Sequence, residues 1–210
     1  MIYHFINLIG WEKIYDAEFQ ENELFFADSI SIKFLAEILL RKKIKRNSGP
    51  SFLAEFRKFK SPNFCIICSK KTKYTLDKNY ILEADKEISD PFQYGVKISQ
   101  EIKDYDYVLL GVSTPKQNLI AKGIHSQNKS QKIFTFGAII DDLILERGIP
   151  TKIQENGFEW FYRFFLDPKR SVTKYYQTIY SMISILLNKT KRAKFLKLSS
   201  KFHYDQNKKI

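Results

Sequence analysis

The nonapeptide YVLLGVSTP spans residues 107–115 and carries the clearest strand signal in the chain. Its nearly continuous apolar run, Tyr107 to Val112, is typical of a strand that is buried on both faces. Thr114-Pro115 then opens a helix, because proline is tolerated in the first helical turn. A buried strand followed at once by a helix predicts an α/β unit at this point of the chain.

Strands and helices alternate on both sides of this unit. Apolar residues at helical spacing predict a helix over residues 31–43, and Ala27-Asp28-Ser29 supplies capping residues before it. Further strands are expected at residues 62–68, 80–82 and 132–137, and further helices at residues 92–103, 158–165 and 171–187. The alternation predicts an α/β fold, a mostly parallel sheet with helices on both faces. In such sheets, ligands bind beyond the carboxyl ends of the strands.

The composition describes a chain that can bury a core. It has 210 residues, of which 44% are hydrophobic and 15% aromatic, and this excludes a disordered protein. No N-terminal segment combines a basic start, an apolar stretch and a small-residue cleavage site, so we expect an unsecreted protein. The longest mostly apolar stretch, Tyr175 to Leu187, has 13 residues and is too short to cross a bilayer. Any contact with a membrane is therefore expected to be peripheral.

Positive charge is concentrated near the C-terminus. The formal net charge is +12, and residues 161–210 contribute 12 basic against 2 acidic residues, whereas residues 1–160 hold 23 against 21. This asymmetry predicts an anionic partner: phospholipid, polyprenyl diphosphate or nucleic acid.

The same C-terminal region has an amphipathic pattern. Apolar and aromatic residues recur at helical spacing: Val172, Tyr175, Tyr176, Ile179, Ile183, Leu186 and Leu187. Basic residues follow at once: Lys189, Lys191, Arg192, Lys194, Lys197 and Lys201. The pattern predicts a helix that lies on an anionic membrane. The alternative is an ordinary C-terminal helix packed on the core, followed by a solvated basic tail.

Cysteine and histidine give no sign of a metal site. Cys65 and Cys68 lie three residues apart in the predicted strand 62–68, so their side chains point to opposite faces and cannot converge on one ion. We read them as small core residues. The three histidines are scattered along the chain. We therefore expect neither a metal nor another cofactor.

Three motifs follow one another between residues 111 and 170. They are Gly111-Val112-Ser113-Thr114-Pro115-Lys116-Gln117, then Phe136-Gly137-Ala138-Ile139-Ile140-Asp141, then Gly157-Phe158-Glu159-Trp160-Phe161-Tyr162-Arg163 with Pro168-Lys169-Arg170. In type, order and spacing they resemble the signatures of the WecG/TagA/CpsF family, glycosyltransferase family 26. The similarity is dense over residues 104–176 and patchy over residues 7–56.

The resemblance implies an inverting glycosyltransferase with a Rossmann-like core that works without a metal. Such an enzyme takes a sugar of the N-acetylmannosamine type, its uronic acid or a hexose from a UDP-sugar. The acceptor is a sugar on undecaprenyl or another polyprenyl diphosphate, in cell-surface polysaccharide or teichoic-acid-type synthesis. The resemblance further implies a core over residues 1–157, shortened in its N-terminal part, and a helical basic appendage over residues 158–210. The protein would be cytoplasmic and peripheral, on the inner face of the bacterial cytoplasmic membrane.

Carried over residue by residue, the resemblance gives three catalytic residues: Asp28 as the general base, Arg46 as the arginine of an Arg-x-x-Gly motif, and Gln117 as the glutamine of Pro-Lys-Gln. Expected substrate-binding residues are Asn7, Lys116, Gly137, Asp141, Glu159, Arg163 and Arg170. The chemistry needs such groups, because the attacking hydroxyl must lose a proton to a nearby carboxylate. The UDP leaving group develops negative charge, which arginine, lysine or a helix N-terminus stabilises. The chain departs from the family pattern where Ser29, not glycine, follows Asp28.

Each candidate has a structural alternative. Asp28 would simply cap the helix at residues 31–43, Arg46 would be one solvated charge in a basic run, and Lys116 and Gln117 would be surface residues of a first helical turn. Asp141 would end a strand in a turn, and Glu159 would pair with Arg163 four residues on.

For the protein as a whole, the alternative function is a non-catalytic basic protein on the same scaffold that binds a membrane or nucleic acid. A nucleic-acid partner is not expected, because the basic excess is confined to the C-terminal region and no recognised nucleic-acid-binding motif occurs. The sequence leaves the oligomeric state open.

Overall fold

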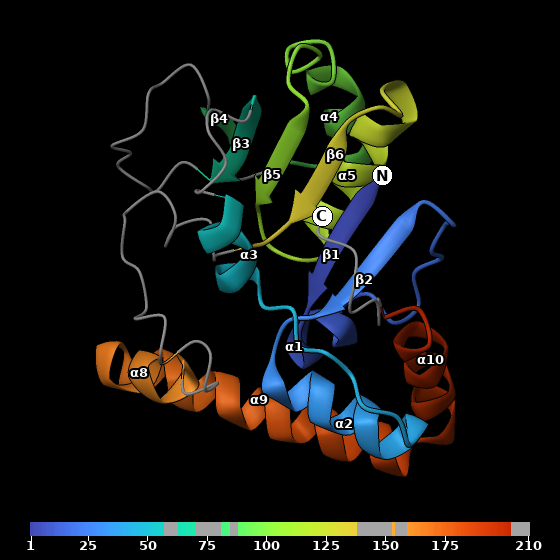
Figure 1. Cartoon of the computed structure of the whole chain (residues 1–210), viewed down its shortest axis with the longest axis vertical. Helices are drawn as coiled ribbons and strands as arrows, with labels where there is room; N and C mark the ends of the chain where they lie inside the picture. The colour runs from blue at the N-terminus through green and yellow to red at the C-terminus, as the bar shows by residue number, and fades with distance from the viewer. Residues whose placement is uncertain (57–62, 70–80, 85–87, 138–152, 154–158, 203–210) are drawn as a thin grey trace. The chain divides into compact units, whose positions relative to one another are not determined.

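The described strands form one six-stranded sheet (Figure 1). The computed structural model describes residues 1–56, 63–69, 81–84, 88–137, 153 and 159–202. The strands are β1 (Ile2–Ile6), β2 (Glu23–Ala27), β3 (Phe64–Ser69), β4 (Ile81–Ala84), β5 (Tyr107–Gly111) and β6 (Lys132–Thr135). Their order across the sheet is β2-β1-β6-β5-β3-β4. Strands β1, β6, β5, β3 and β4 pair in parallel, which confirms the predicted fold class.

Helices connect these strands and follow them. They are α1 (Leu8–Glu12), α2 (Ile30–Leu40), α3 (Gly49–Phe56), α4 (Pro91–Ile98), α5 (Lys116–Gln127), α8 (Glu159–Leu166), α9 (Pro168–Leu187) and α10 (Lys189–Ser199). The last three form the predicted C-terminal helical region. In the part of the chain that the structure describes, no helix is both long enough and apolar enough to span a membrane.

Several helix ends differ from the predicted ones for local reasons. Helix α2 ends at Leu40 instead of residue 43, because Arg41 takes a left-handed conformation with φ of 54°. Helix α4 ends at Ile98 instead of residue 103, and the hydroxyl of Ser99 there donates to the Val96 carbonyl. Helix α5 begins at Lys116, and Pro115, which follows a cis peptide bond, is its N-cap and not its first residue.

The chain folds into two compact units. Unit 1 comprises Met1–Phe5, Phe19–Leu24 and Phe52–Arg147, and unit 2 comprises Ile6–Glu18, Phe25–Ser51 and Gly148–Ile210. The predicted boundary between core and appendage falls at residues 157–158, outside the described residues, and stays a prediction.

Unit 1 packs different side chains on the two faces of its strands. One face meets α4 and α5 through an aliphatic cluster that includes Ile2, Cys65, Ile67, Val108, Leu110, Ile120, Ile124 and Ile133. Glycines let these two helices approach closely: a Cβ on Gly123 would lie 2.1 Å from the carbonyl oxygen of Phe92. The other face is aromatic, with Phe52 of α3 packed against Phe5, Phe134 and Phe136. The β alternation of apolar side chains thus fills both sides of the sheet.

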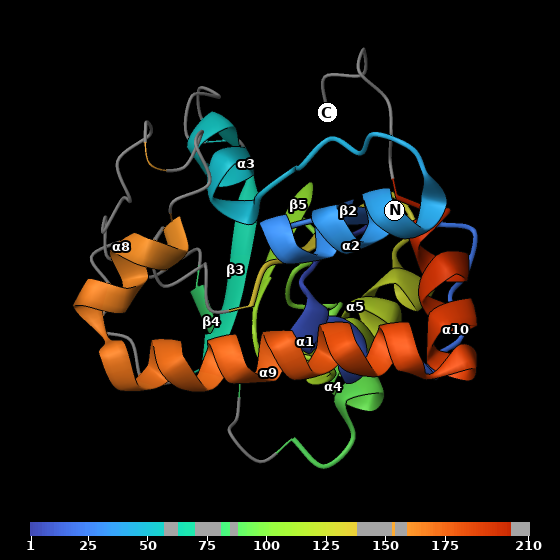
Figure 2. The ribbon, with the colours of Figure 1, turned by 90° about the horizontal axis from the view of Figure 1, so that it is seen from below.

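Unit 2 is built on helices α1, α2, α9 and α10, which Figure 2 shows from below. Trp11 of α1 and Phe195 of α10 are both fully buried, and their rings meet edge to face at 5.4 Å. Leu198 is also buried, and Phe202 forms a β-bridge with Phe25. The alternative of a solvated tail after α9 is therefore wrong for residues 189–202, because this segment buries Phe195, Leu198 and Phe202 in unit 2.

Candidate active site

Unit 2 contains an open pocket of about 530 Å³. Its lining comes from the turns after β1 and β2, from α2, from Arg46 and from α9. The residues are Asn7, Ile9, Asp28, Ser29, Ile30, Ser31, Phe34, Arg46, Lys174, Tyr175, Thr178, Ile179 and Met182. Polar and charged groups thus share the pocket with a mostly aliphatic wall, as is usual for sites that bind small molecules.

Two of the predicted residues reach this pocket because they follow neighbouring strands. Asn7 comes directly after β1 and Asp28 directly after β2, and the backbone N–H of Asp28 donates to the Ile6 carbonyl at 3.0 Å. Asn7 also caps α1, since its Oδ1 accepts from the N–H of Gly10 at 2.8 Å. Residues at the carboxyl ends of adjacent strands meet at one edge of a sheet, which is where ligands bind in such folds.

The segment from Arg46 to Gly49 holds Asp28 in place. Arg46 donates from Nε to the Asp28 carbonyl at 2.9 Å, and the N–H of Gly49 donates to Asp28 Oδ1 at 2.7 Å. The predicted capping role of Asp28 is wrong, because Ser29 is the N-cap of α2 and accepts from Ile32 N–H. Arg46 is half-buried, so it is not merely a solvated member of a charge run. Hydrogen bonds therefore hold Asp28 next to the segment of Arg46, and both residues line the pocket.

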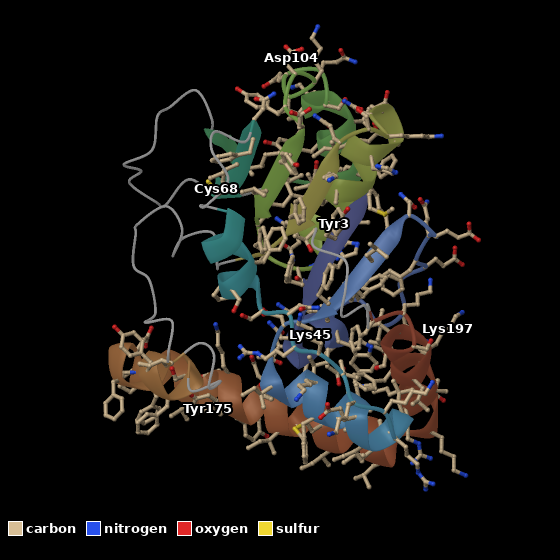
Figure 3. The ribbon with its side chains drawn as sticks, in the orientation of Figure 1. Tyr3, Lys45, Cys68, Asp104, Tyr175 and Lys197 are labelled. Atoms are coloured by element: carbon tan, nitrogen blue, oxygen red, sulfur yellow. The ribbon has the colours of Figure 1, made fainter. Side chains whose placement is uncertain are left out.

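One wall of the pocket is formed by α9, and this wall was not predicted from the sequence. Lys174, Tyr175, Thr178, Ile179 and Met182 line it, and Figure 3 labels Tyr175 on this helix. Tyr175 and Ile179 were recognised only as members of an amphipathic stripe. The remaining three, Lys174, Thr178 and Met182, lie beside that stripe on the helix, and no pattern in the sequence marked them as part of a pocket.

A second group of predicted residues comes together in unit 1. Gln117 is buried, and its Oε1 accepts from the N–H of Gly137 at 2.9 Å while its Nε2 donates to Thr114 Oγ at 2.9 Å. Gly137 has φ of +62°, a conformation that favours glycine. Gln117 thus ties together the turns after β5 and β6, and the alternative of a surface glutamine is wrong. Lys116 begins α5 next to it, and the roles of Lys116, Gln117 and Gly137 toward a ligand stay predictions.

The other predicted site residues lie in or after β6 and in the C-terminal helices. Asp141 lies outside the described residues. Glu159 and Arg163 lie in α8 and Arg170 lies in α9, and of their side chains nothing is described. Within the described ranges, no group of three or more His, Cys, Asp or Glu side chains is arranged to hold a metal ion.

A buried polar network in unit 1 was also not predicted from the sequence. His4 is fully buried, and its Nε2 forms a hydrogen bond with Glu23 Oε2 at 3.0 Å, while its Nδ1 lies 3.0 Å from Asn118 Nδ2 and 3.2 Å from Thr135 Oγ1. Lys122 lies 3.3 Å from the other carboxylate oxygen. Burial lowers the pKa of His4, against the opposing hydrogen bond to Glu23. Burial alone would raise the pKa of Glu23, but the bonds from His4 and from Gln20 N–H outweigh it and the pKa is lowered.

Comparison with known proteins identifies one family. The model of the Glycosyl transferase WecG/TagA/CpsF family matches residues 3–195. No curated protein and no solved structure matches the chain. The match covers both compact units, the pocket of unit 2 and the Gln117 turn of unit 1.

Proposed function

The chain belongs to the WecG/TagA/CpsF family of glycosyltransferases, and from this premise we propose that it transfers a sugar from a UDP-sugar to a sugar on a polyprenyl diphosphate. The transferred sugar is of the N-acetylmannosamine type, its uronic acid or a hexose. The product belongs to cell-surface polysaccharide or teichoic-acid-type synthesis, and the reaction inverts the anomeric centre.

The observation that carries this proposal is the meeting of Asn7, Asp28 and Arg46 in one pocket. Asp28 is the general base, because inversion in one displacement requires a carboxylate within reach of the attacking hydroxyl. Its Oδ1 accepts from Gly49 N–H, which fixes the orientation of the carboxylate. Asn7 is exposed and lines the same pocket, and we assign its amide to the sugar hydroxyls.

Positive charge at the pocket suits a diphosphate. Arg46 and Lys174 both line the pocket. We assign Arg46 to the charge that develops as UDP leaves, since a fixed guanidinium stabilises such charge without a metal. Lys116 and Gly137, after β5 and β6, are assigned to the donor, and Gln117 to holding their turns. From the family resemblance, we propose four further substrate-binding residues: Asp141, Glu159, Arg163 and Arg170.

The apolar wall of the pocket fits the other half of such an acceptor. Ile9, Phe34 and Met182 lie in the same cavity as the charged groups. A molecule with a sugar diphosphate head and a hydrocarbon tail presents this combination, whereas a free sugar does not. We therefore place the enzyme on the inner face of the bacterial cytoplasmic membrane, where it is peripheral and meets its lipid-linked acceptor.

Replacement of Asp28 by Asn tests the proposal. We expect Asp28→Asn to lower turnover by roughly 10²–10⁴-fold, because the amide cannot take the proton. The variant keeps a side-chain oxygen that accepts from the N–H of Gly49, so we expect the segment from Arg46 to Gly49 to keep its structure. Turnover is measured as the mass of the lipid product formed from a panel of UDP-sugars and a synthetic polyprenyl diphosphate sugar.

The matched control is Asp104→Asn, which removes one exposed carboxylate from unit 1 and leaves transfer unchanged. Asp28→Asn with the turnover of the unmodified protein would remove Asp28 from the mechanism. Product formation from none of the donors would overturn the transferase proposal as a whole.

A further inference from the structure

Lys191 lies where three helices of unit 2 meet. Its ammonium group donates to Glu12 Oε2 in α1 at 2.8 Å and to Ser184 Oγ in α9 at 3.0 Å. The same ammonium lies 5.4 Å from the centre of the Tyr15 ring. Asn188, the N-cap of α10, fixes the backbone at this point, because its Oδ1 accepts from the N–H of Lys191 at 3.0 Å. A single side chain of α10 therefore bridges α1 to α9.

Both helices that Lys191 bridges carry residues of the pocket, and Figure 2 shows them side by side. Asn7 is the N-cap of α1 and lines the pocket, and Met182 of α9 lines it as well. Each helical residue rises by about 1.5 Å, so Glu12 lies roughly 7.5 Å along α1 from Asn7. In the same way, Ser184 lies roughly 3 Å along α9 from Met182. The bridge therefore joins the two helices within about two turns of the pocket.

The carboxylate of Glu12 depends on this bridge. Its Oε1 is buried and has no hydrogen-bond partner among the residues that the structure describes, whereas its Oε2 accepts from Lys191. The hydrogen bond to Glu12 raises the pKa of Lys191, so the ammonium stays charged. A mostly buried carboxylate that loses its cation is expected to turn toward water. Because α1 has only five residues and is too short to be stable alone, this movement would displace Asn7.

Lys194 lies about one helical turn further along α10 and makes a different contact. It pairs with Asp16, an exposed residue that follows α1, and its ammonium lies 5.1 Å from the centre of the Tyr15 ring. In the described part of the chain, Lys194 forms no hydrogen bond with α9. Lys194 therefore resembles Lys191 in helix, charge and aromatic neighbour, but it does not join the two helices of the pocket.

We propose that Lys191 is a positioning residue: through Glu12 and Ser184 it sets the separation between the N-terminal end of α1 and the α9 wall of the pocket. The inference rests on the proposed function, because the ligand whose binding it controls is the sugar diphosphate head of the acceptor. Lys191 does not line the pocket itself, so it acts on the walls and not on the ligand. Part of the positive charge near the C-terminus thus maintains the shape of a binding site.

The test measures how tightly the full chain binds a short-chain prenyl diphosphate sugar, by isothermal titration calorimetry. Lys191→Met removes the ammonium but keeps an unbranched side chain. We expect it to weaken binding roughly tenfold, because the pocket loses its fixed geometry. The matched control is Lys194→Met, which removes the same charge from the same helix and the same aromatic ring. We expect this variant to bind within about twofold of the unmodified protein, since its ion pair is exposed.

Exchange of the two charged partners separates geometry from long-range charge. Lys191→Glu and Glu12→Lys each place two like charges together, so we expect each alone to weaken binding. If total charge alone mattered, Glu12→Lys would instead tighten binding to a diphosphate, because it adds positive charge. The double variant restores an opposite pair with the carboxylate on α10, which accepts from the Ser184 hydroxyl. We expect it to bind within roughly threefold of the unmodified protein.

Two results would overturn the inference. One is equal affinity in Lys191→Met and Lys194→Met, and the other is a folded, unmodified protein that does not bind the short-chain probe. Urea unfolding is recorded for every variant, so that a loss of binding is not mistaken for a loss of fold. If Lys191→Met does not fold, Ser184→Ala takes its place, because it removes only the bond to α9. We expect Ser184→Ala to weaken binding roughly threefold, and unchanged affinity would contradict the positioning role.

Transfer to the same short-chain acceptor is scored separately. We expect Lys191→Met to raise the KM for the acceptor roughly tenfold and to keep the KM for the UDP-sugar within about twofold. Binding that depends on Lys191 in a protein that transfers no sugar would support the positioning role and contradict the proposed function. Transfer with the same acceptor KM in Lys191→Met and Lys194→Met would support the function and overturn the positioning role. The two failures are therefore distinguishable.

Discussion

The two compact units treat their charged side chains differently. In unit 1, Glu23 is buried and held between His4 and Lys122, so its charge is satisfied inside the unit. In unit 2, Asp28 and Arg46 are half-buried and line an open pocket. The difference teaches that a buried charge is not by itself a sign of a site. Glu23 and Lys122 pair with each other inside unit 1, whereas Asp28 and Arg46 line the pocket of unit 2.

The largest expected effect is a loss of unfolding free energy when the buried network around Glu23 in unit 1 is broken. Glu23→Ala leaves His4 and Lys122 without their anionic partner, and breaking a buried pair in this way costs about 3–5 kcal/mol of unfolding free energy. The measurement is urea-induced unfolding followed by circular dichroism. Arg46→Ala in unit 2 is the comparison, and we expect a loss below about 1.5 kcal/mol for its hydrogen bond to the carbonyl of half-buried Asp28. Equal losses in the two variants would remove the distinction between the units.

A pH dependence of stability is the next largest effect. The unfolded chain binds a proton at His4 near its ordinary pKa of 6.5, whereas burial lowers the pKa of the folded state. Between these values the unfolded state binds more protons, so stability decreases as the pH falls below about 6.5, by up to ~1.4 kcal/mol per pH unit. The lowered pKa of Glu23 adds a further loss below its ordinary value of 4.5. The effect is measured as the midpoint of urea-induced unfolding at pH 7.5, 6.5 and 5.5. The slope m of the unfolding free energy against urea concentration is expected to stay roughly constant.

The matched pair for this prediction is His4→Gln and His125→Gln. His125 is only half-buried, and burial also lowers its pKa. We expect His4→Gln to abolish most of the dependence on pH and His125→Gln to retain most of it. The reverse result would assign the dependence to the surface histidine and contradict the role of the buried network.

The smallest expected effect concerns the ion pairs of unit 2. Lys191→Met removes the bond to Glu12, whose side chain is 20% exposed like that of Lys191, and pairs of this kind contribute about 0.2–1 kcal/mol. The loss is expected to shrink in high salt, because partly exposed pairs are screened. It is measured by urea unfolding at low and high NaCl. A loss above about 3 kcal/mol would place this pair with the buried network of unit 1.

The sequence was informative wherever a segment is apolar and local. Strand β5 and helix α9 were predicted within a few residues, because their patterns are determined by burial on two faces or along one stripe. Strand β1 was missed, since Tyr3 and His4 interrupt its apolar run although all five of its residues are buried. Helix α10 was missed because its basic residues read as a tail. Its partners, Trp11, Glu12 and Asp16, lie more than 170 residues earlier in the chain.

The candidate site divides in the same way. Asp28 and Arg46 were identified through a family resemblance, and no spacing in the sequence places them beside each other. Lys174 and Met182 were not identified, because a wall contributed by a distant helix leaves no local pattern. The hydrogen bonds of Gln117 to Thr114 and Gly137 depend on two strands lying next to each other. Such contacts follow from topology, which a single sequence does not specify.

The interleaving of the two units bears on the order in which the chain is completed at the ribosome. Every residue of unit 1 has been synthesised once Arg147 is added, but unit 2 still lacks α9 and α10. Domains generally fold as units, the earlier one first during synthesis. Trp11 must then wait for Phe195, which is synthesised much later, to cover it. The nascent chain therefore carries an unfinished unit 2 until α9 and α10 have been synthesised, and the pocket with its α9 wall forms only then.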